Sequence, residues 1–540
     1  MKRHAFGVRT NAAERPGQPA FLHFGDSDMG GTMFSAPDQF MLDGMDAVCE
    51  GVDKIFPAPK RHLGDVPAAC RDLSALLTAD RDEMGRSYWL APRLAAAYLR
   101  YFLPWNLVRL CALLPSLPLG DVPLSPVAAD AGSGPLTFPM ALWLSRPELR
   151  RLPLTFICAD SAPQPLKYGM KLFEHLRGRL EPSSPWKMVP QRGDISALPS
   201  MVREKMWLLS FCNVLNECGG RKRTETLASA VRFAAGRLLP GGMLLCVEPG
   251  TRLGARTVSD LRSMCLGGTS AGKTDREDAS HGRADRESFG AGPQRLEDYD
   301  PGTARFTVSS PCTHQGRCPL GAHSGQAWCH FRFTPQEIPR KLSALSEEAG
   351  LAKQSLSLSF VLMRKSGDAG CPDFPAGGAQ IPARVVSDGI RLPGFPGRAR
   401  YACSEKGLLL MTGAEGLPSG MLAEAAIPGP ERRDAKSGAL MAVPAGGCRQ
   451  VPRGSGPGSV IGPGAMPGLP PTSAYAFVSE RAPAAPAFFG GNGTVRPAAR
   501  KSVMDPERGT RACRGDGGSG KTRRGKHHEK AYFGKTGGGR

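Results

Sequence analysis

Three cysteines in one short stretch of the chain carry the clearest chemical signal. They are Cys312, Cys318 and Cys329, and their spacing is Cys-x5-Cys-x10-Cys. Thiolates are soft ligands that select zinc or iron–sulfur clusters. Because this spacing is wider than the Cys-x2-Cys pairs of ordinary zinc sites, it favours a larger iron–sulfur cluster, which four cysteines hold. Zinc stays open as the alternative metal.

The fourth ligand of such a cluster must come from elsewhere in the chain. Cys371, in a loop of glycine and proline, and Cys403, beside a predicted strand, are the two candidates. The residue pattern alone does not choose between them. The histidines His314, His323 and His330 are candidate substitutes, and His330 could instead donate a hydrogen bond to a neighbouring sulfur.

A glycine turn upstream is the second motif with chemical meaning. A predicted strand ends at Asp130, and Gly132 and Gly134 follow before a helix begins. Glycine lets the backbone approach a ligand where a side chain would clash. Thr137 stands where NAD-binding folds place a third glycine, so the turn better suits S-adenosylmethionine, which has no pyrophosphate to bind.

Acidic residues after the next two predicted strands complete the expected cofactor site. Asp160 ends the second strand and is placed to bind both ribose hydroxyls. Asp194 follows the third strand, where it could meet the adenine amine. An Asn/Asp-Pro-Pro-aromatic motif, which aligns an amine for methyl transfer, is absent. The corresponding strand end is Ser210–Glu217. The catalytic group therefore stays unassigned.

The elements around this turn alternate between strand and helix. Short apolar runs predict strands, and apolar residues at three- and four-residue spacing predict helices. Repeated β-α units indicate an α/β fold, with a parallel sheet covered on both faces. The predicted strands are 127–130, 154–160, 206–212, 243–248, 356–363 and 408–411, and the predicted helices are 72–115 with breaks at proline, 137–146, 165–179, 225–239 and 340–350.

The chain is strongly basic, with 540 residues and a formal net charge of +20. Lys and Arg side chains that neutralise phosphates favour a nucleic-acid partner. The 15 cysteines, together with a start that lacks the apolar core of a signal peptide, predict a reducing compartment. Proline and arginine interrupt the best apolar run, 102–119, so no membrane partner is expected.

Taken together, these motifs resemble the Rsm-twenty-two family of methyltransferase-like proteins of the small ribosomal subunit, whose mitochondrial type is methyltransferase-like protein seventeen. The resemblance covers about 70–415 and is most specific in the cysteine block. The matching residues are Ala97–Pro104, Arg109, Asp130–Pro135, Val247–Thr251, Pro311–Cys312, His314, Cys318–Pro319, Trp328–Phe331 and Arg384–Val386.

The resemblance implies both a fold and a function. It implies a class I S-adenosylmethionine-dependent methyltransferase (Rossmann-like) domain, and it selects Cys403 over Cys371 as the fourth ligand of a 4Fe-4S cluster. It also implies assembly and translation of the small ribosomal subunit through rRNA binding, by a protein that is a monomer apart from the ribosome. The cytoplasm is the expected compartment, with the mitochondrial matrix as the alternative. Active rRNA methylation and a zinc-stabilised RNA-binding module with a vestigial cofactor site are the alternative functions.

These observations divide the chain into expected regions. Composition changes and the motif positions set the boundaries. The regions are a poorly structured N-terminus (1–65), a helical domain (66–120), a methyltransferase-like α/β domain (121–266 and 351–413), a flexible insertion (267–300), a Cys-rich iron–sulfur module (301–350, with Cys403) and a disordered basic tail rich in glycine and proline (414–540).

Overall fold

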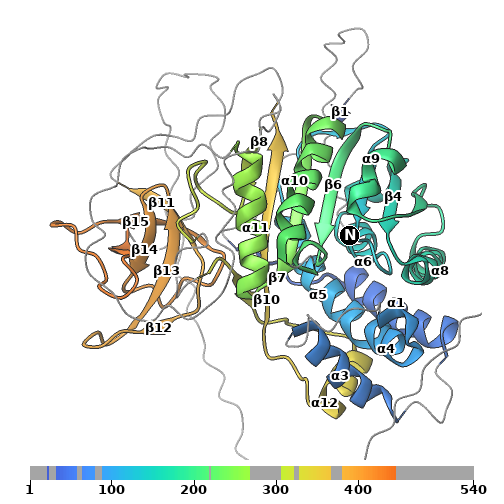
Figure 1. Ribbon diagram of the computed structural model, residues 1–540. Helices are drawn as coiled ribbons and strands as arrows, with labels where there is room; N and C mark the ends of the chain where they lie inside the picture. The colour runs from blue at the N-terminus through green and yellow to red at the C-terminus, as the bar shows by residue number, and fades with distance from the viewer. Residues whose placement is uncertain are drawn as a thin grey trace, which may run out of the picture. The chain divides into compact units, whose positions relative to one another are not determined.

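A computed structural model gives the fold of the chain (Figure 1). The structure describes residues 21–22, 32–57, 64–78, 88–217, 220–267, 306–320, 328–366 and 380–445. The chain divides into two compact units, Met1–Gly456 and Pro457–Arg540, and every described residue lies in the first. The predicted insertion 267–300 lies outside the described residues except for Gly267, and so does the tail from 446 onward.

A mixed sheet forms the centre of the fold. Its strands follow the order β5-β4-β3-β6-β7-β10-β8, with β9 paired to β10. Neighbours among β3 to β7 are parallel, whereas β10 runs antiparallel to both β7 and β8. The bounds are β3 (Val127–Ala131), β4 (Thr155–Asp160), β5 (Lys187–Arg192), β6 (Met206–Cys212), β7 (Leu238–Pro249), β8 (Phe306–Ser310), β9 (Phe331–Phe333) and β10 (Leu356–Lys365).

This strand order is that of a class I methyltransferase fold. The first strand, β3, lies between β4 and β6, so the order reverses there, and one antiparallel strand is inserted next to the last parallel one. In open α/β sheets a crevice opens at such a reversal, outside the carboxyl ends of the strands. The prediction of a Rossmann-like α/β domain is therefore confirmed.

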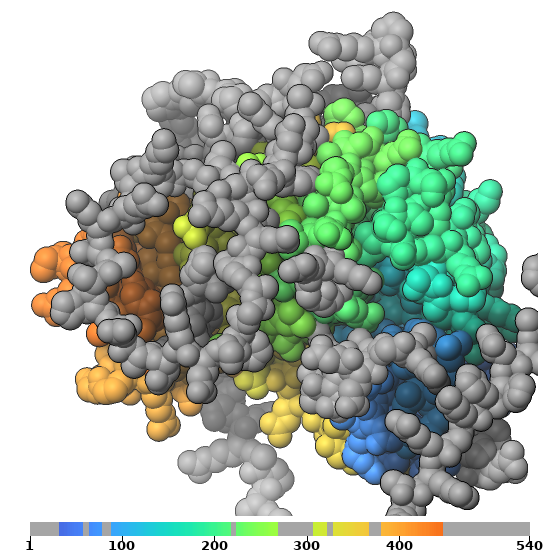
Figure 2. All heavy atoms as spheres, viewed as in Figure 1, coloured from blue at the N-terminus to red at the C-terminus, as the bar shows by residue number. Residues whose placement is uncertain are grey.

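Two layers of helices cover the two faces of the sheet. Along β4 the side chains alternate, with Phe156 and Cys158 in one apolar core and Ile157 and Ala159 in the other. The first core also contains α6 (Thr137–Ser145) and α8 (Pro163–Leu180), and the second contains α10 (Gly220–Arg237) and α11 (Arg252–Cys265). The layer of α10 and α11 faces the viewer in Figures 1 and 2.

A helical layer precedes the sheet, and its part from α3 onward falls in the predicted helical region 66–120. It comprises α1 (Gln39–Ile55), α3 (Val66–Thr78), α4 (Pro92–Ala97), a π-helical turn η3 (Tyr98–Phe102) and α5 (Leu103–Leu113). The π turn leads directly into α5, where Pro104 occupies the first turn, a position that tolerates proline. The remaining short elements are β1 (Phe21–Leu22), η2 (Tyr88–Leu90), η4 (Leu114–Ser116), β2 (Val122–Pro123), α7 (Pro147–Arg150), η5 (Ile195–Ala197), α9 (Leu198–Met201), η6 (Leu215–Glu217) and α12 (Arg340–Glu348).

The prediction that residues 1–65 are poorly structured is wrong for α1. Asp38 caps this helix by accepting a hydrogen bond from the Met41 N–H, at 2.8 Å. The glycines that suggested a loop are contact points between helices. A Cβ at Gly44 would overlap Leu144 of α6, and a Cβ at Gly51 would crowd His175 of α8.

The predicted Cys-rich module, 301–350, is not a separate domain. Its first part supplies β8, which is an edge strand of the main sheet, and β9 pairs with β10 from Leu356 to Leu358. The reason is that Phe306, Val308 and Phe331 are apolar and complete the two cores of the sheet. The cysteines therefore lie in the segments that connect strands of this sheet.

A second sheet corrects the boundaries near the C-terminus. Residues 381–413, expected in the α/β domain, and residues 414–444, expected in a disordered tail, form one small barrel instead. Its core consists mostly of alanine, including Ala383, Ala402 and Ala425, so its strands look like low-complexity sequence. The strands are β11 (Ile381–Val385), β12 (Ile390–Arg391), β13 (Arg398–Ser404), β14 (Gly407–Met411), β15 (Leu422–Ala426) and β16 (Leu440–Pro444).

No helix within the described ranges is both long enough and apolar enough to cross a membrane. The longest described helices are α8 and α10, and each carries several charged residues. The charges on α8 and α10 fit helices that keep one side exposed while the other packs on the sheet.

We expect Gly44→Val to destabilise the protein by about 2 kcal/mol, because the added side chain overpacks the contact between α1 and the fully buried Leu144. The free energy of unfolding from urea denaturation measures this. The matched control is Gly178→Ala in α8, where a Cβ meets nothing within 4 Å, and which should stabilise by about 0.5–1 kcal/mol. Equal stability of Gly44→Val and wild type would contradict the close packing of α1.

Candidate functional site

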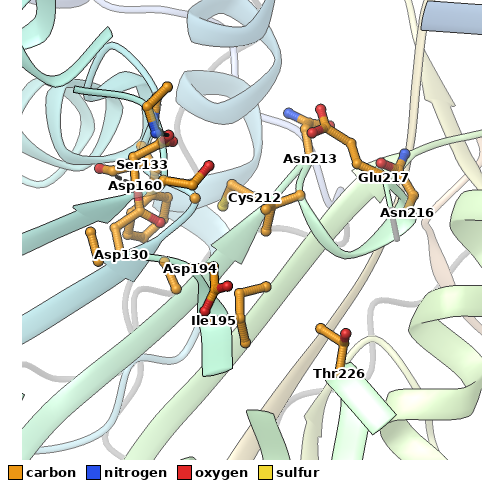
Figure 3. A pocket seen from close by; sticks show the side chains of 18 of the residues that line it. Asp130, Ser133, Asp160, Asp194, Ile195, Cys212, Asn213, Asn216, Glu217 and Thr226 are labelled. Carbon is orange, nitrogen blue, oxygen red and sulfur yellow. Dashed lines mark hydrogen bonds between the residues drawn. The ribbon is translucent and has the colours of Figure 1, made fainter. Parts of the chain in front are cut away.

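A cavity of about 1030 Å³ opens at the carboxyl ends of the central strands (Figure 3). It lies where the strand order reverses, so it occupies the place where this class of sheet binds ligands. All five residues predicted to contact the cofactor line it: Asp130, Gly132, Gly134, Asp160 and Asp194. The volume is at the upper end of the roughly 300–1,000 Å³ that small-molecule pockets occupy, which leaves room beyond one cofactor.

The glycine turn connects β3 to α6 and is held by backbone hydrogen bonds. The N–H groups of Gly132 and Ser133 both donate to the Ala159 carbonyl on β4, at 2.8 and 2.9 Å. Both glycines have left-handed backbones, with φ of 74° at Gly132 and 52° at Gly134. A Cβ at Gly132 would overlap Val214, whereas a Cβ at Gly134 would meet no atom within 4 Å. Gly134 is therefore the position where a side chain would enter open space.

Asp130 fixes this turn to the neighbouring strand. Its carboxylate is only 1% exposed and accepts hydrogen bonds from Ser210 Oγ on β6 at 2.6 Å and from Ser133 Oγ at 2.8 Å. Burial raises the pKa of Asp130 to about 7, although both serine hydrogen bonds lower it. Because the Asp130 side chain is almost completely buried and bonded to Ser133 of the turn, Asp130 acts mainly to position the turn.

Asp160 presents its carboxylate at the end of β4, as predicted. Its Oδ2 accepts from the Gly134 N–H at 2.9 Å, and its Oδ1 accepts from the Ala162 N–H at 2.8 Å. Burial raises the pKa of Asp160, and the two backbone hydrogen bonds lower it. Each carboxylate oxygen can accept a second hydrogen bond, so the group retains acceptor capacity for a pair of ligand hydroxyls.

Asp194 lines the cavity near the end of β4, where the neighbouring Gly193 N–H donates to the Asp160 carbonyl at 3.0 Å, and it caps η5. Its Oδ1 accepts from Ser196 Oγ at 2.6 Å and from the Ala197 N–H at 3.1 Å. The hydrogen bond from Ser196 is the main reason that the pKa of Asp194 is lowered. The carboxylate therefore stays charged at neutral pH and borders the cavity where a ligand amine could approach it.

The sequence did not predict the residues at the far end of the cavity. Asn213 follows β6 with a left-handed backbone, φ 58°, and its N–H donates to the Val247 carbonyl at 2.8 Å. Non-glycine residues in this conformation are concentrated at functional sites, and asparagine tolerates it well. Figure 3 shows Asn213 and Glu217 close together, across the cavity from Asp130 and Asp160. Only their position after the fourth parallel strand could have identified them.

An aromatic wall from the helical layer closes the same end of the cavity. Tyr88 and Tyr98 stack with ring centroids 5.6 Å apart, and Trp89 lies 4.7 Å from Tyr98. All three line the cavity. Burial raises the pKa of Tyr98, and the negative charges of Glu217 and Asp160 raise it further. The phenols therefore stay protonated and remain hydrogen-bond donors.

The four cysteines predicted as metal ligands lie close enough to influence one another electrostatically, and Cys318 and Cys329 pack against the apolar core that contains Cys403. Burial raises the pKa of the Cys329 thiol, and the charges of Cys318, Cys312 and Cys403 raise it further. Cys403 on β13 has a raised pKa for the same reasons, and its Sγ lies 3.4 Å from His314 Nε2. The structure therefore brings together thiols that are separated by up to 91 positions in the chain.

A buried cation accompanies the thiols. Arg262 is 2% exposed and donates from Nη2 to the His314 carbonyl at 2.9 Å. Burial raises the pKa of Cys312, and the charge and hydrogen bond of Arg262 lower it. A buried guanidinium beside four thiols suits a group that leaves net negative charge on the sulfurs, as a thiolate-bound cluster does.

Of the other candidate ligands, His314 lies beside Cys403, and two lie outside the described residues. In the part of the chain that is described, the four cysteines included, no three histidine, cysteine or acidic side chains are arranged to hold a metal ion. Cys371 and His323 lie outside the described residues. His330 contacts the Trp328 carbonyl through Nδ1 at 3.0 Å and stacks on the Trp328 ring.

Comparison with known proteins finds similarity among solved structures. No family model and no curated protein matches the chain. A methyltransferase from Pyrococcus furiosus is 15% identical over 26% of this chain and 64% of its own, with a TM-score of 0.20. Aeropyrum pernix fibrillarin with bound S-adenosyl-L-methionine is 17% identical over 29% and 65%, with a TM-score of 0.21. The chain thus spans less than two thirds of both structures.

A third similar structure is an arsenic(III) S-adenosylmethionine methyltransferase from Chlamydomonas reinhardtii. It is 14% identical over 48% of this chain and 69% of its own, with a TM-score of 0.23. The fold of this chain is defined by the order and directions of the strands in its own main sheet.

The raised pKa of Asp130 predicts a pH-dependent stability. A carboxyl with a folded pKa of about 7 and an unfolded value of 3.8 contributes stability at low pH that is lost as the pH rises from about 4 to 7. Asp130→Asn should remove this loss and raise the free energy of unfolding at pH 8 by about 2 kcal/mol, with no gain at pH 4. Urea denaturation at both pH values measures the difference.

Asp194→Asn is the control of opposite sign. Its pKa is lowered in the folded state, so its contribution is present above pH 3.8 and is lost as the pH falls. This variant should lose a little stability at pH 8. If Asp130→Asn were also less stable at pH 8, the buried carboxyl would not carry the raised pKa.

Proposed function

We propose that this protein binds S-adenosylmethionine in the cavity and binds small-subunit rRNA, and that it acts in assembly of the small ribosomal subunit and in translation. The observation that carries the cofactor proposal is the open space at Gly134, bordered by the Asp160 carboxylate at the reversal of strand order. The net charge of +20 and the family resemblance support the rRNA partner. The protein works as a monomer apart from the ribosome, in the cytoplasm or the mitochondrial matrix.

Each cofactor residue has a distinct role in this proposal. Asp160 accepts the ribose hydroxyls with its remaining lone pairs, and Asp194 accepts from the adenine amine. Gly134 provides space for the amino-acid part of the ligand, while Gly132 and Asp130 hold the turn. When bound, S-adenosylmethionine supplies an activated methyl group on its sulfonium.

The second part of the proposal is a 4Fe-4S cluster held by Cys312, Cys318, Cys329 and Cys403. Its support is the mutual proximity of the four thiols and the buried Arg262 beside them. Zinc is the alternative occupant of the same thiols. Because β13 supplies one ligand and the segments around β8 and β9 supply the others, a cluster would join the barrel to the main sheet.

Methyl transfer to rRNA is a second candidate function, and one observation favours it. Asn213 has a left-handed backbone at the end of the fourth parallel strand and lines the same cavity as the aromatic wall. Its side-chain carbonyl can accept a hydrogen bond from an amine and orient it. The Tyr88 and Tyr98 rings provide flat surfaces against which a base can stack.

We expect Gly134→Ala to weaken binding of S-adenosylmethionine by about tenfold or more, because the methyl group would project into the ligand space. Isothermal titration calorimetry measures the affinity. The matched control is Gly350→Ala, a residue at the end of α12 with a similar φ of 63° and no atom within 4 Å of the added Cβ. Gly350→Ala bears the same backbone strain and should bind S-adenosylmethionine with the wild-type affinity. Wild-type protein that binds no S-adenosylmethionine would refute the cofactor proposal.

We expect anaerobically purified wild-type protein to be brown and to contain iron and acid-labile sulfide in equal amounts. Cys403→Ser should reduce both to background, whereas Cys49→Ala, at a buried thiol in α1, should leave both unchanged. Metal and sulfide analysis provides the measurement. Stoichiometric zinc without iron would replace the cluster proposal by the zinc alternative.

A further inference from the structure

The C-terminal barrel has a recognisable closed topology. Neighbouring strands pair in the ring β11-β15-β16-β14-β13, and β13 pairs back to β11. All these pairs are antiparallel except β14 with β16, which is parallel. A closed five-stranded ring with this connectivity is an OB-type barrel, a fold that binds single-stranded nucleic acids through its strand surface and loops.

One side of this barrel is already covered by the rest of the chain. Outward-facing Cys403, Leu408 and Leu410 belong to the apolar core that also contains Phe331 and Leu358 of the main sheet region. The exposed fraction of Leu410 is only 1%. A ligand therefore cannot use this strand surface, and the ends of the barrel are what remains.

The end that carries the β12–β13 hairpin has excess positive charge. Arg391 and Arg398 are exposed and lie directly opposite each other in the strand register. Like charges in such a cross-strand pair destabilise a hairpin unless an anion lies between them. Of the nearby carboxylates, Asp388 pairs with Arg332, and Glu415 accepts from the backbone N–H of Arg398 at 2.7 Å. The Arg398 guanidinium donates to the Gly389 carbonyl at 3.1 Å, so its charge is not paired with a carboxylate by this contact.

A second cavity, of about 500 Å³, adjoins the same end of the barrel. Arg332, Asp388 and Arg400 line it together with Phe34 and Phe333, whose rings stack with centroids 4.3 Å apart. Guanidinium groups next to aromatic rings are the combination that holds a phosphate and a base of a single strand.

The opposite end of the barrel differs in charge. It contains the β13–β14 turn and the loop from β15 to β16. Positive and negative residues balance there. The basic residues are Lys406, Arg432, Arg433 and Lys436, and the acidic residues are Glu405, Glu424, Glu431 and Asp434. Variants at this end therefore serve as a control for nonspecific electrostatic attraction of RNA.

We propose that the hairpin end of the barrel, together with the adjoining cavity, binds single-stranded RNA. The choice of RNA rests on the proposed function, whereas the position of the surface rests on the barrel topology, the facing arginines and the cavity. Phosphates lie between Arg391 and Arg398, and one base enters the cavity towards Phe333. The barrel thereby holds an RNA strand at a site separate from the cofactor cavity.

The test compares two double variants of the full-length protein by fluorescence anisotropy. The probe is a labelled, unstructured RNA of about 12 nucleotides, a length within the footprint of one OB barrel. Arg391→Ala/Arg398→Ala should weaken binding by about tenfold and lower the slope of log K against log salt by about one. Arg432→Ala/Arg433→Ala, at the balanced end, should change the affinity by no more than about twofold.

Several readouts keep the outcomes distinct. Both variants should keep at least the wild-type unfolding midpoint, and both should keep the wild-type affinity for S-adenosylmethionine, so failure of the cofactor proposal is scored separately. Equal loss of RNA binding in the two variants would overturn the assignment of the surface. If duplex RNA of the same sequence competes as strongly as the single strand does, the assignment of the surface to single-stranded RNA would be overturned as well. Phe333→Leu should weaken RNA binding without changing the salt slope, because it removes stacking and no charge.

Discussion

The buried carboxyl of Asp130 is the interaction on which the cofactor cavity depends. It joins the glycine turn, through Ser133, to β6, through Ser210, at the point where the strand order reverses. Burial of a carboxyl is costly unless its hydrogen bonds are satisfied, and here two hydroxyls satisfy it. With the turn fixed in this way, the Gly134 N–H and Asp160 face the same space. The geometry of the cavity is thus set before any ligand enters.

The sequence was sufficient to predict the central part of this arrangement. Periodicity placed β3, β4, β6 and the helices between them within a few residues, and parallel strands necessarily bring Asp130 and Asp160 to one edge of a sheet. The far end of the cavity could not be predicted in the same way. Asn213 acts through its left-handed backbone, and Tyr88 through packing of a separate helical layer. Neither property has a local sequence pattern.

Two of the errors in the predicted boundaries, at α1 and at the barrel, share one physical cause, which is the use of small residues at close contacts. Gly44 and Gly51 lie in a capped helix because α1 approaches its neighbours too closely for side chains. Alanines fill the barrel because a five-stranded ring has a narrow interior. Composition alone classes both segments with loops and tails. Only the pairing of β11 with β13 and β15 shows that the alanine-rich strands form a core.

The position of Cys403 connects these features. Leu409 and Ala402 point into the barrel, so Cys403, next along β13, must point out, towards the core that holds Cys318 and Cys329. The apolar side of the barrel is therefore committed to the main sheet, and its hairpin end remains open with Arg391 and Arg398. A barrel fixed on one side can present RNA in a constant orientation, whereas a free barrel could only tether it. The alternation of side chains along β13 thus separates the side of the barrel that packs on the main sheet from the end that we propose binds RNA.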